Sequence, residues 1–184
     1  MNYDANLGIG NSTGMAFWAP IDTALPEYPS EVLTSEDWTL IGAVSEDGIS
    51  YSPNRDLTPL RNWSKEIERL LTSDSNGELE VPLLYTNDTT FKLIFSEDAV
   101  TVTNATQTHG KLISVNIDPN EVPEGKAFVF LMKDDDDMMM IGTTRGFITS
   151  VSDVSFSPSD AIIWTATISA KNWTFMKDNT QVTQ

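Results

Sequence analysis

The sequence predicts a mainly β protein, an antiparallel β-sandwich or barrel with one short flanking α-helix and long extended arms or loops. Three observations support this fold class. Apolar and polar residues alternate over many short runs, turn-forming residues separate the runs, and only one segment changes to a helical period. The clearest alternation lies within 161–170, where one side of the predicted strand carries Ile162, Trp164, Ala166 and Ile168.

Glycines and prolines divide the other runs. Tight turns are expected at Glu46–Gly48 and Ser75–Gly77, where glycine can adopt a positive φ. Pro53 is expected to end the run that follows the first turn, and Pro26 and Pro29 predict an extended connector because proline cannot donate a ladder hydrogen bond. The predicted strands are 14–20, 38–45, 49–52, 65–74, 78–85, 100–103, 113–117, 126–133, 138–144, 147–156 and 161–170.

The single predicted helix follows Asn87. Asn87 can cap the helix, and Asp88 would then lie at its positive end. Phe91, Ile94 and Phe95 fall on one face of a helix of at most about three turns.

Length and composition indicate one globular domain. The chain has 184 residues, of which 40% are hydrophobic and 21% charged. We expect an N-terminal arm at 1–14, a β-sandwich core at 15–175 with a loop at about 45–64, and a polar C-terminal tail at 176–184. The longest apolar run, Ala127–Met132, is far short of the ~20 residues that span a bilayer, so no membrane contact is expected.

The chain is strongly acidic. Its 27 acidic and 11 basic residues give a formal net charge of −16. Binding to nucleic acid depends on Lys and Arg meeting phosphate, so a nucleic-acid-binding role is disfavoured. The absence of cysteine excludes disulfides and thiolate metal sites. The N-terminus lacks a basic and an apolar region in succession, so no signal peptide is expected.

No pattern predicts catalysis, a cofactor or a metal site. His109 is the only histidine, and a turn residue is a more frequent role for it than a general base. The four consecutive residues Asp134–Asp137 could suggest calcium, but a calcium loop spaces its ligands around a glycine. A solvated hairpin tip is the simpler interpretation of this run.

The stretch from Trp38 to Trp63 has an aromatic residue at each end of a long charged segment. This pattern suggests a loop anchored in the core by Trp38 and Trp63, whose middle contacts something else. The charged residues of this segment include Arg55, Asp56 and Arg61.

Four segments resemble a known family in their order and spacing. They are APIDTALP at 19–26, WTLIGAVSEDGI at 38–49, NRD followed by a tryptophan at 54–63, and ITSVSDVSFSPSDAIIWTATISA at 148–170. Together they resemble the major tail tube proteins of long non-contractile-tailed, siphovirus-like bacteriophages. The sequence departs from that family where Ser64 and Lys65 follow Trp63 in place of a small Gly/Asp-rich step.

The resemblance implies a β-sandwich or barrel of the tail-tube type and a structural, non-enzymatic role in the virion tail. It implies a homo-hexameric ring, rings stacked into a tube, and a lumen that DNA crosses without adhering. Tail terminator, distal tail-tip and tape measure proteins are the implied partners, and synthesis in the host bacterial cytoplasm is implied as well. Residues from about 50 to 62 are then expected to reach the adjacent ring. The predicted subunit or ring contacts are Asp47, Gly48, Asn54, Arg55, Asp56 and Arg61.

Two other classes of function remain open at this point. A monomeric β-sandwich could bind a receptor or a carbohydrate through its five tryptophans. A hydrolase of unrecognised type has the least support, because no nucleophile with a neighbouring base can be identified.

Overall fold

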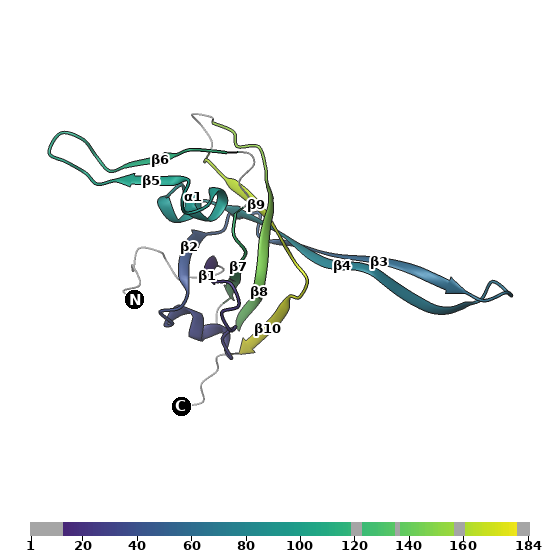
Figure 1. Ribbon diagram of the computed structural model, residues 1–184. Helices are drawn as coiled ribbons and strands as arrows, with labels where there is room; N and C mark the ends of the chain where they lie inside the picture. The colour runs from purple at the N-terminus through teal and green to yellow at the C-terminus, as the bar shows by residue number, and fades with distance from the viewer. Residues whose placement is uncertain (1–12, 119–122, 135–136, 157–160, 180–184) are drawn as a thin grey trace, which may run out of the picture.

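The computed structural model describes residues 13–118, 123–134, 137–156 and 161–179, and Figure 1 shows a β-rich body from which two hairpins project in different directions. The strands are β1 (Thr13–Pro20), β2 (Thr39–Ala43), β3 (Ser50–Arg61), β4 (Ile67–Leu83), β5 (Val100–Thr103), β6 (Leu112–Val115), β7 (Lys126–Asp134), β8 (Asp137–Val151), β9 (Trp164–Ala170) and β10 (Thr174–Asn179). One 3-10 helix, η1 (Pro29–Leu33), and one α-helix, α1 (Asp88–Phe95), complete the described elements.

Eight of these strands form one antiparallel sheet. Seven follow the order β2-β1-β7-β8-β9-β4-β3, and β10 also pairs with β8. The long strand β8 joins two parts of the sheet, because its residues 137–142 pair with β10 and its residues 147–151 pair with β9. Strands β5 and β6 form a separate two-stranded sheet. The predicted fold class, mainly β and antiparallel with one helix, is confirmed.

The first core layer follows from alternation along β1. Met15, Phe17 and Ala19 all face one buried cluster, which agrees with the strand predicted at 14–20. Val32 of η1 and Trp38 lie in the same cluster, so the connector between β1 and β2 covers this face of the sheet. The connector carries no strand, as predicted, but contains the 3-10 helix at the end of its proline-rich part.

The second core layer lies on the opposite face of β1 and β7. Phe128 and Phe130 of β7 stack with ring centroids 6.3 Å apart and face residues of β4 and β9. Leu93 places α1 against the same cluster. The other strand residues in this cluster include Ala16, Ile41, Leu79, Val81, Leu83, Ile141, Ala166 and Ile168.

The helix begins where the sequence predicts. The side-chain oxygen of Asn87 accepts a hydrogen bond from the backbone N–H of Thr90 at 2.8 Å. Phe91 and Phe95 both contact Trp164 edge-on, with centroid distances of 5.4 and 6.0 Å. The apolar face of α1 therefore packs on β9 as well as on the core.

Two predictions about the middle of the chain are wrong. Ser75–Gly77 is not a turn but part of β4, which joins the two runs predicted at 65–74 and 78–85 into one strand. Pro53 does not end a strand either, because β3 continues from Ser50 to Arg61. Strand β3 lies at the edge of the sheet, and an edge strand tolerates proline because one side of it has no ladder partner.

Two predicted boundaries near the C-terminus also change. Residues 176–179, expected to belong to a polar tail, are part of β10, because Thr174–Asn179 pair with β8. The run predicted at 147–156 is the end of β8, which extends only to Val151. The hairpin predicted through the aspartate run joins β7 and β8, but the side chains of that run lie outside the described residues.

Candidate assembly interface

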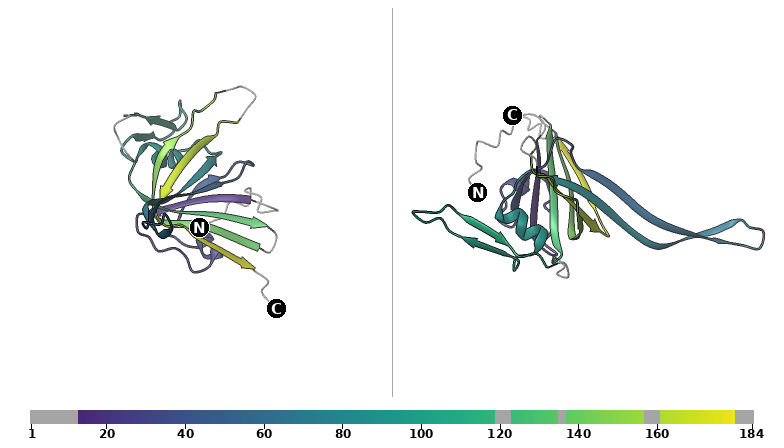
Figure 2. Two further views of the ribbon diagram at one scale, coloured as in Figure 1. Left: turned by 90° about the vertical axis from the view of Figure 1, so that its right-hand side faces the viewer. Right: turned by 90° about the horizontal axis from the view of Figure 1, so that it is seen from above.

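The hairpin of β3 and β4 extends far beyond the sheet that holds its base. Strand β9 pairs with β4 only over Gly77–Leu83, so among the described strands Ile67–Asn76 has β3 as its only neighbour. Figures 1 and 2 show this part of the hairpin projecting away from the body as a twisted ribbon. We call residues 54–76 the arm. Ten residues of β4 at ~3.3 Å each give it a reach of about 33 Å.

Aromatic side chains from β10 and the connection before it hold the base of the arm. Tyr51 contacts Trp173 and Phe175 edge-on, with ring centroids 6.3 and 5.2 Å away. Trp173 donates its indole N–H to the carbonyl oxygen of Gly77 at 2.9 Å. Asn76 donates to the hydroxyl of Ser169 at 3.1 Å. The base is therefore fixed to the body, which gives the arm a defined direction.

The tip of the arm is a tight three-residue turn between Asn62 and Glu66. The backbone N–H of Asn62 donates to the carbonyl oxygen of Glu66 at 3.0 Å, and the Asn62 side chain accepts from the Glu66 N–H at 3.0 Å. Lys65 has a φ of +64°, the left-handed conformation that ends such a turn. Arg61 donates to the carbonyl oxygen of Lys65 at 2.9 Å. These contacts leave Trp63 at the apex.

Apolar side chains of the arm are exposed to solvent. An isolated two-stranded hairpin is at best marginally stable in water, and contiguous exposed apolar surface usually marks an interaction site. The exposed fractions are 44% for Leu57, 49% for Leu60, 53% for Ile67, 42% for Leu71 and 102% for Trp63. The arm has the properties of a surface that another molecule covers.

Four predicted contact residues lie on β3 within the arm. They are Asn54, Arg55, Asp56 and Arg61, and the ladder pairs the first three with Asn76, Ser75 and Asp74. The side chains of Arg55 and Asp56 lie outside the described part of the structure. The segment predicted as a loop is therefore one strand of a hairpin.

The other two predicted contact residues lie in the body. Asp47 and Gly48 form the turn before β3, where the Gly48 N–H donates to the carbonyl oxygen of Ser45 at 3.0 Å and φ of Gly48 is +73°. The Ser45 hydroxyl donates to the Asp47 carboxylate at 3.3 Å. This turn and the arm are separate features, so the structure does not bring all six predicted residues together.

The two predicted anchors have opposite environments. Trp38 is 2% exposed and lies in the first core layer, where the sequence analysis places it. The interpretation of Trp63 as a second core anchor is wrong for the subunit, because this side chain is fully exposed at the tip of the arm. A tryptophan in a short turn far from the core has no apolar neighbours to bury it.

Sequence reasoning missed the β4 half of the arm. The sequence predicts a separate strand at 65–74, because Ser75–Gly77 has the composition of a turn, whereas Ile67 and Leu71 lie in the same strand as Gly77. A signal was present in the near-symmetric apolar runs on both sides of the polar segment 61–66. That pattern is typical of a hairpin that turns at its centre.

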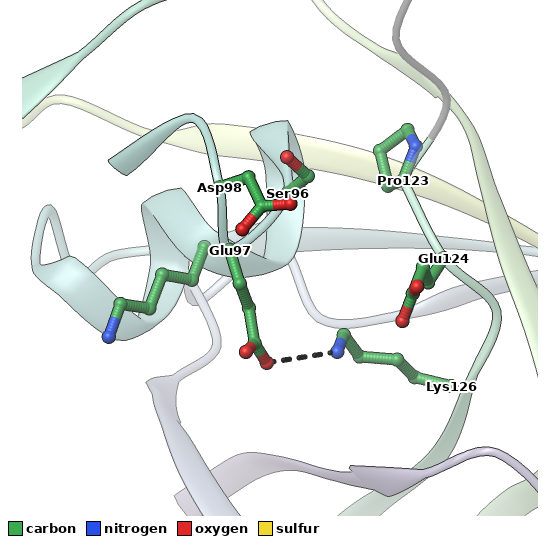
Figure 3. A pocket seen from close by; sticks show the side chains of 7 residues that line it. Ser96, Glu97, Asp98, Pro123, Glu124 and Lys126 are labelled. Atoms are coloured by element: carbon green, nitrogen blue, oxygen red, sulfur yellow. Dashed lines mark hydrogen bonds and ion pairs between the residues drawn. The ribbon is translucent and has the colours of Figure 1, made fainter. Parts of the chain in front are cut away.

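Most of the residues that line two of the body's cavities are polar or charged. Figure 3 shows one of about 310 Å³ beside the end of α1, where the Glu97 carboxylate meets the Lys126 amino group at 3.3 Å. Lys126 is buried, and its Nζ also lies 4.2 Å from the centroid of the Trp18 ring. Asp98 and Glu124 line the same cavity, so Lys126 neutralises part of an acidic surface.

The second cavity, of about 410 Å³, lies between β8 and the connection from β9 to β10. At its rim Arg145 pairs with Asp22, and the Arg145 Nε–H donates to Asp22 Oδ1 at 3.1 Å.

Within the described residues, no group of three His, Cys, Asp or Glu side chains is placed to hold a metal ion. His109 is exposed, with its ring Nδ1 2.8 Å from the carbonyl oxygen of Thr108. No helix in the described ranges is long and apolar enough to cross a membrane.

Several solved structures of tail and injection machines are similar to the chain. A chain of the sheath–tube complex of an extracellular contractile injection system, PVC, in its extended state is 10% identical, with a TM-score of 0.46, and the match covers 97% of this chain and 99% of that one. The cap that terminates the anti-feeding prophage tube is 14% identical, with a TM-score of 0.46 and coverages of 74% and 83%. A chain of the native gene transfer agent virion is 14% identical, with a TM-score of 0.42 and coverages of 77% and 91%.

No curated protein matches the sequence. The family model described as phage tail tube protein matches residues 1–175, which is nearly the whole chain. The chain therefore belongs to the phage tail tube protein family and is a structural subunit of a phage-type tail tube.

Proposed function

We propose that the subunits assemble into hexameric rings, that the rings stack into a tube with an acidic lumen, and that genome DNA passes through this lumen to the host. The arm is proposed to reach from one ring to the next. The observation that carries this proposal is the arm itself, a hairpin with exposed apolar residues that projects about 33 Å beyond its own core.

The sheet of each subunit supplies two further surfaces for assembly. Strands β2 and β3 end the strand order, so each has an unpaired edge within the described part of the chain. An exposed edge tends to pair with another strand, and a closed ring gives every edge a defined partner. Pairing between the sheets of neighbouring subunits is therefore a suitable way to close a ring.

The acidity of the chain fits a channel for DNA. Six copies at −16 each carry 6 × −16 = −96 formal charges per ring. Duplex DNA carries one negative charge per ~1.7 Å of its axis, so an acidic wall repels it and prevents adhesion during passage. The proposal places acidic side chains on the lumen and requires no base-specific contact.

The setting follows from the same proposal. The subunits are made in the bacterial cytoplasm and function in the virion tail. A tail terminator protein closes one end of the tube, distal tail-tip proteins occupy the other, and a tape measure protein lies in the lumen before the DNA.

Electron microscopy of assembled particles tests the rings directly. Class averages are expected to show six-fold rings around a central channel. Two results together contradict the proposal. The purified subunit stays monomeric at high concentration, and the virion tail contains no subunit of this mass.

A shortened arm tests the ring-to-ring contact. Replacing 56–74 by Asn-Gly leaves Arg55 opposite Ser75, a pair that a two-residue turn can join. Removing residues from β3 alone is less suitable, because it leaves β4 without its partner. The shortened subunit is expected to fold and to form no tubes. Tubes of normal length from this variant contradict the role of the arm.

A further inference from the structure

Two rows of side chains cross the strands β1, β7, β8 and β10 on opposite faces of the sheet. Residues directly opposite each other in antiparallel strands share a face, and successive residues of one strand alternate between faces. The first row consists of Gly14, Met132, Met139 and Lys177. The second row, shifted by one position on every strand, consists of Met15, Leu131, Met140 and Met176.

The methionines of the two rows have opposite environments. Met15 and Met140 of the second row lie in the first core layer and are 2% and 0% exposed. Met132 and Met139 of the first row are 38% and 42% exposed, and Gly14 beside Met132 has no side chain to cover it. Met139 and Met140 are consecutive in the chain, so they form a matched pair of one exposed and one buried thioether.

A thioether is the group in methionine that peroxides oxidise. The sulfur donates an electron pair to one oxygen of the peroxide, and the O–O bond breaks. The proton of the transferred oxygen moves to the leaving hydroxide, so that a sulfoxide and water are formed. A sulfoxide is polar, so it is tolerated at an exposed position but costs free energy in an apolar core.

We propose that Met132 and Met139 form a modification site at which hydrogen peroxide or an organic hydroperoxide oxidises the folded subunit. The buried Met15, Met138 and Met140 are protected by the same fold. Lys177 lies directly opposite Met139 on the same face, and its ammonium group can donate a hydrogen bond to the Met139 sulfoxide. Oxidation therefore makes one exposed surface of the body more polar and leaves the core intact.

Limited oxidation of the free subunit tests this site. The native chain is treated with hydrogen peroxide, and fragment mass spectra of its peptides follow each methionine separately. Met132 and Met139 are each expected to gain one oxygen atom. Met140 is expected to react at least about tenfold more slowly than Met139, because the strands must open before peroxide reaches it. Equal rates for Met139 and Met140 overturn the inference.

The unfolded chain is the control for this comparison. In urea the three consecutive residues Met138, Met139 and Met140 are all in contact with solvent, so they are expected to react at equal rates. A preference for Met139 that persists in urea arises from the local sequence and not from the fold, and the inference is then wrong. Neither measurement depends on whether tubes form.

Substitution of the exposed pair tests the effect of oxidation on the fold. Met132→Leu and Met139→Leu keep an apolar side chain of similar size at exposed positions, so the variants are expected to fold. Each is expected to take up one oxygen atom fewer than the native chain. The midpoint of urea unfolding of the native chain is expected to be the same before and after limited oxidation.

The double variant shows which methionines cause any loss of stability. If oxidation lowers the midpoint of the native chain but not that of the double variant, the exposed pair supports the core and its oxidation is not confined to the surface. If oxidation lowers both midpoints, buried methionines react and are not protected. Either result contradicts the inference.

Discussion

Trp173 fixes the base of the arm by donating its indole N–H to the carbonyl oxygen of Gly77 at 2.9 Å. The bond joins the connection between β9 and β10 to β4 at the residue where β4 leaves the sheet. Gly77 also lies under Tyr51, which contacts the ring of Trp173. These two aromatic rings occupy the space that a side chain at position 77 would need, which explains why a glycine is found there.

Gly77→Ala is expected to destabilise the subunit. A Cβ at this position would lie 2.5 Å from Trp173 Cδ1 and 2.7 Å from the Tyr51 ring, so the aromatic side chains must shift. Overpacking of this kind costs about 1–3 kcal/mol, measurable as a lower midpoint of urea unfolding. Gly110→Ala is the control, because no atom lies within 4 Å of its added Cβ. Equal midpoints for the two variants contradict the packing argument.

Removal of the helix cap is expected to destabilise the subunit by a similar amount. In Asn87→Ala the backbone N–H of Thr90 loses its acceptor, which costs about 0.5–2 kcal/mol. Asn87→Asp keeps an acceptor oxygen and is expected to retain most of the stability. Urea unfolding of the three proteins measures the difference. An alanine variant as stable as the native chain means that α1 does not depend on this cap.

Local chemistry made much of the body predictable. The cap at Asn87 depends on residues three apart, and the alternation of Met15, Phe17 and Ala19 needs only the period of a strand. Both signals lie within a few residues of the feature they predict. The single flanking helix and the antiparallel strands follow from such signals.

The arm could not be predicted from local sequence patterns, because its features are set by residues that are far apart in the chain. Ser75–Gly77 has the composition of a turn, but Gly77 is required by Trp173, which is 96 residues away in the chain. Pro53 resembles a strand terminator, but it lies on an edge strand whose position is set by the order of the whole sheet. The exposure of Trp63 likewise follows from how far the hairpin extends beyond β9. Patterns within a few neighbouring residues do not reveal this contact, this strand order or this hairpin length.

Acid is expected to remove the contribution of the pair formed by Asp22 and Arg145. The hydrogen bond from Arg145, with its positive charge, holds the pKa of Asp22 below its usual value. A pKa that is lower in the folded state favours the ionised form, so the stabilisation is present above the unfolded-state pKa of about 3.9 and is lost as the pH falls through the folded-state pKa.

Asp22→Asn tests this pH dependence. Asparagine is suitable because φ of Asp22 is +66°, a conformation that asparagine tolerates. The variant is expected to be slightly less stable than the native chain at pH 7, and the difference is expected to shrink as the pH falls below the usual pKa of an aspartate and to disappear once the pH is below the lowered pKa of Asp22. Urea unfolding at several pH values measures the difference. A difference that is constant with pH shows that the ionised carboxylate contributes nothing.

Substitution of the two tryptophans is expected to separate folding from assembly. Trp38→Ala removes a buried side chain from the first core layer, and a large cavity of this kind costs about 3–5 kcal/mol. Trp63→Ala changes a fully exposed side chain, so the unfolding free energy of the subunit is expected to change by less than about 0.5 kcal/mol. Urea unfolding of the free subunits measures both values.

Tube formation is expected to depend on Trp63, although the stability of the free subunit does not. Large aromatic side chains often dominate the binding energy of an interface, and Trp63 is fully exposed at the tip of the arm that we propose reaches the next ring. Trp63→Ala is therefore expected to yield folded subunits that form fewer or shorter tubes by electron microscopy. If instead Trp63→Ala unfolds as readily as Trp38→Ala, the tip of the arm is packed within its own subunit. If it remains stable and forms tubes of normal length, the tip makes no contact that the tube requires.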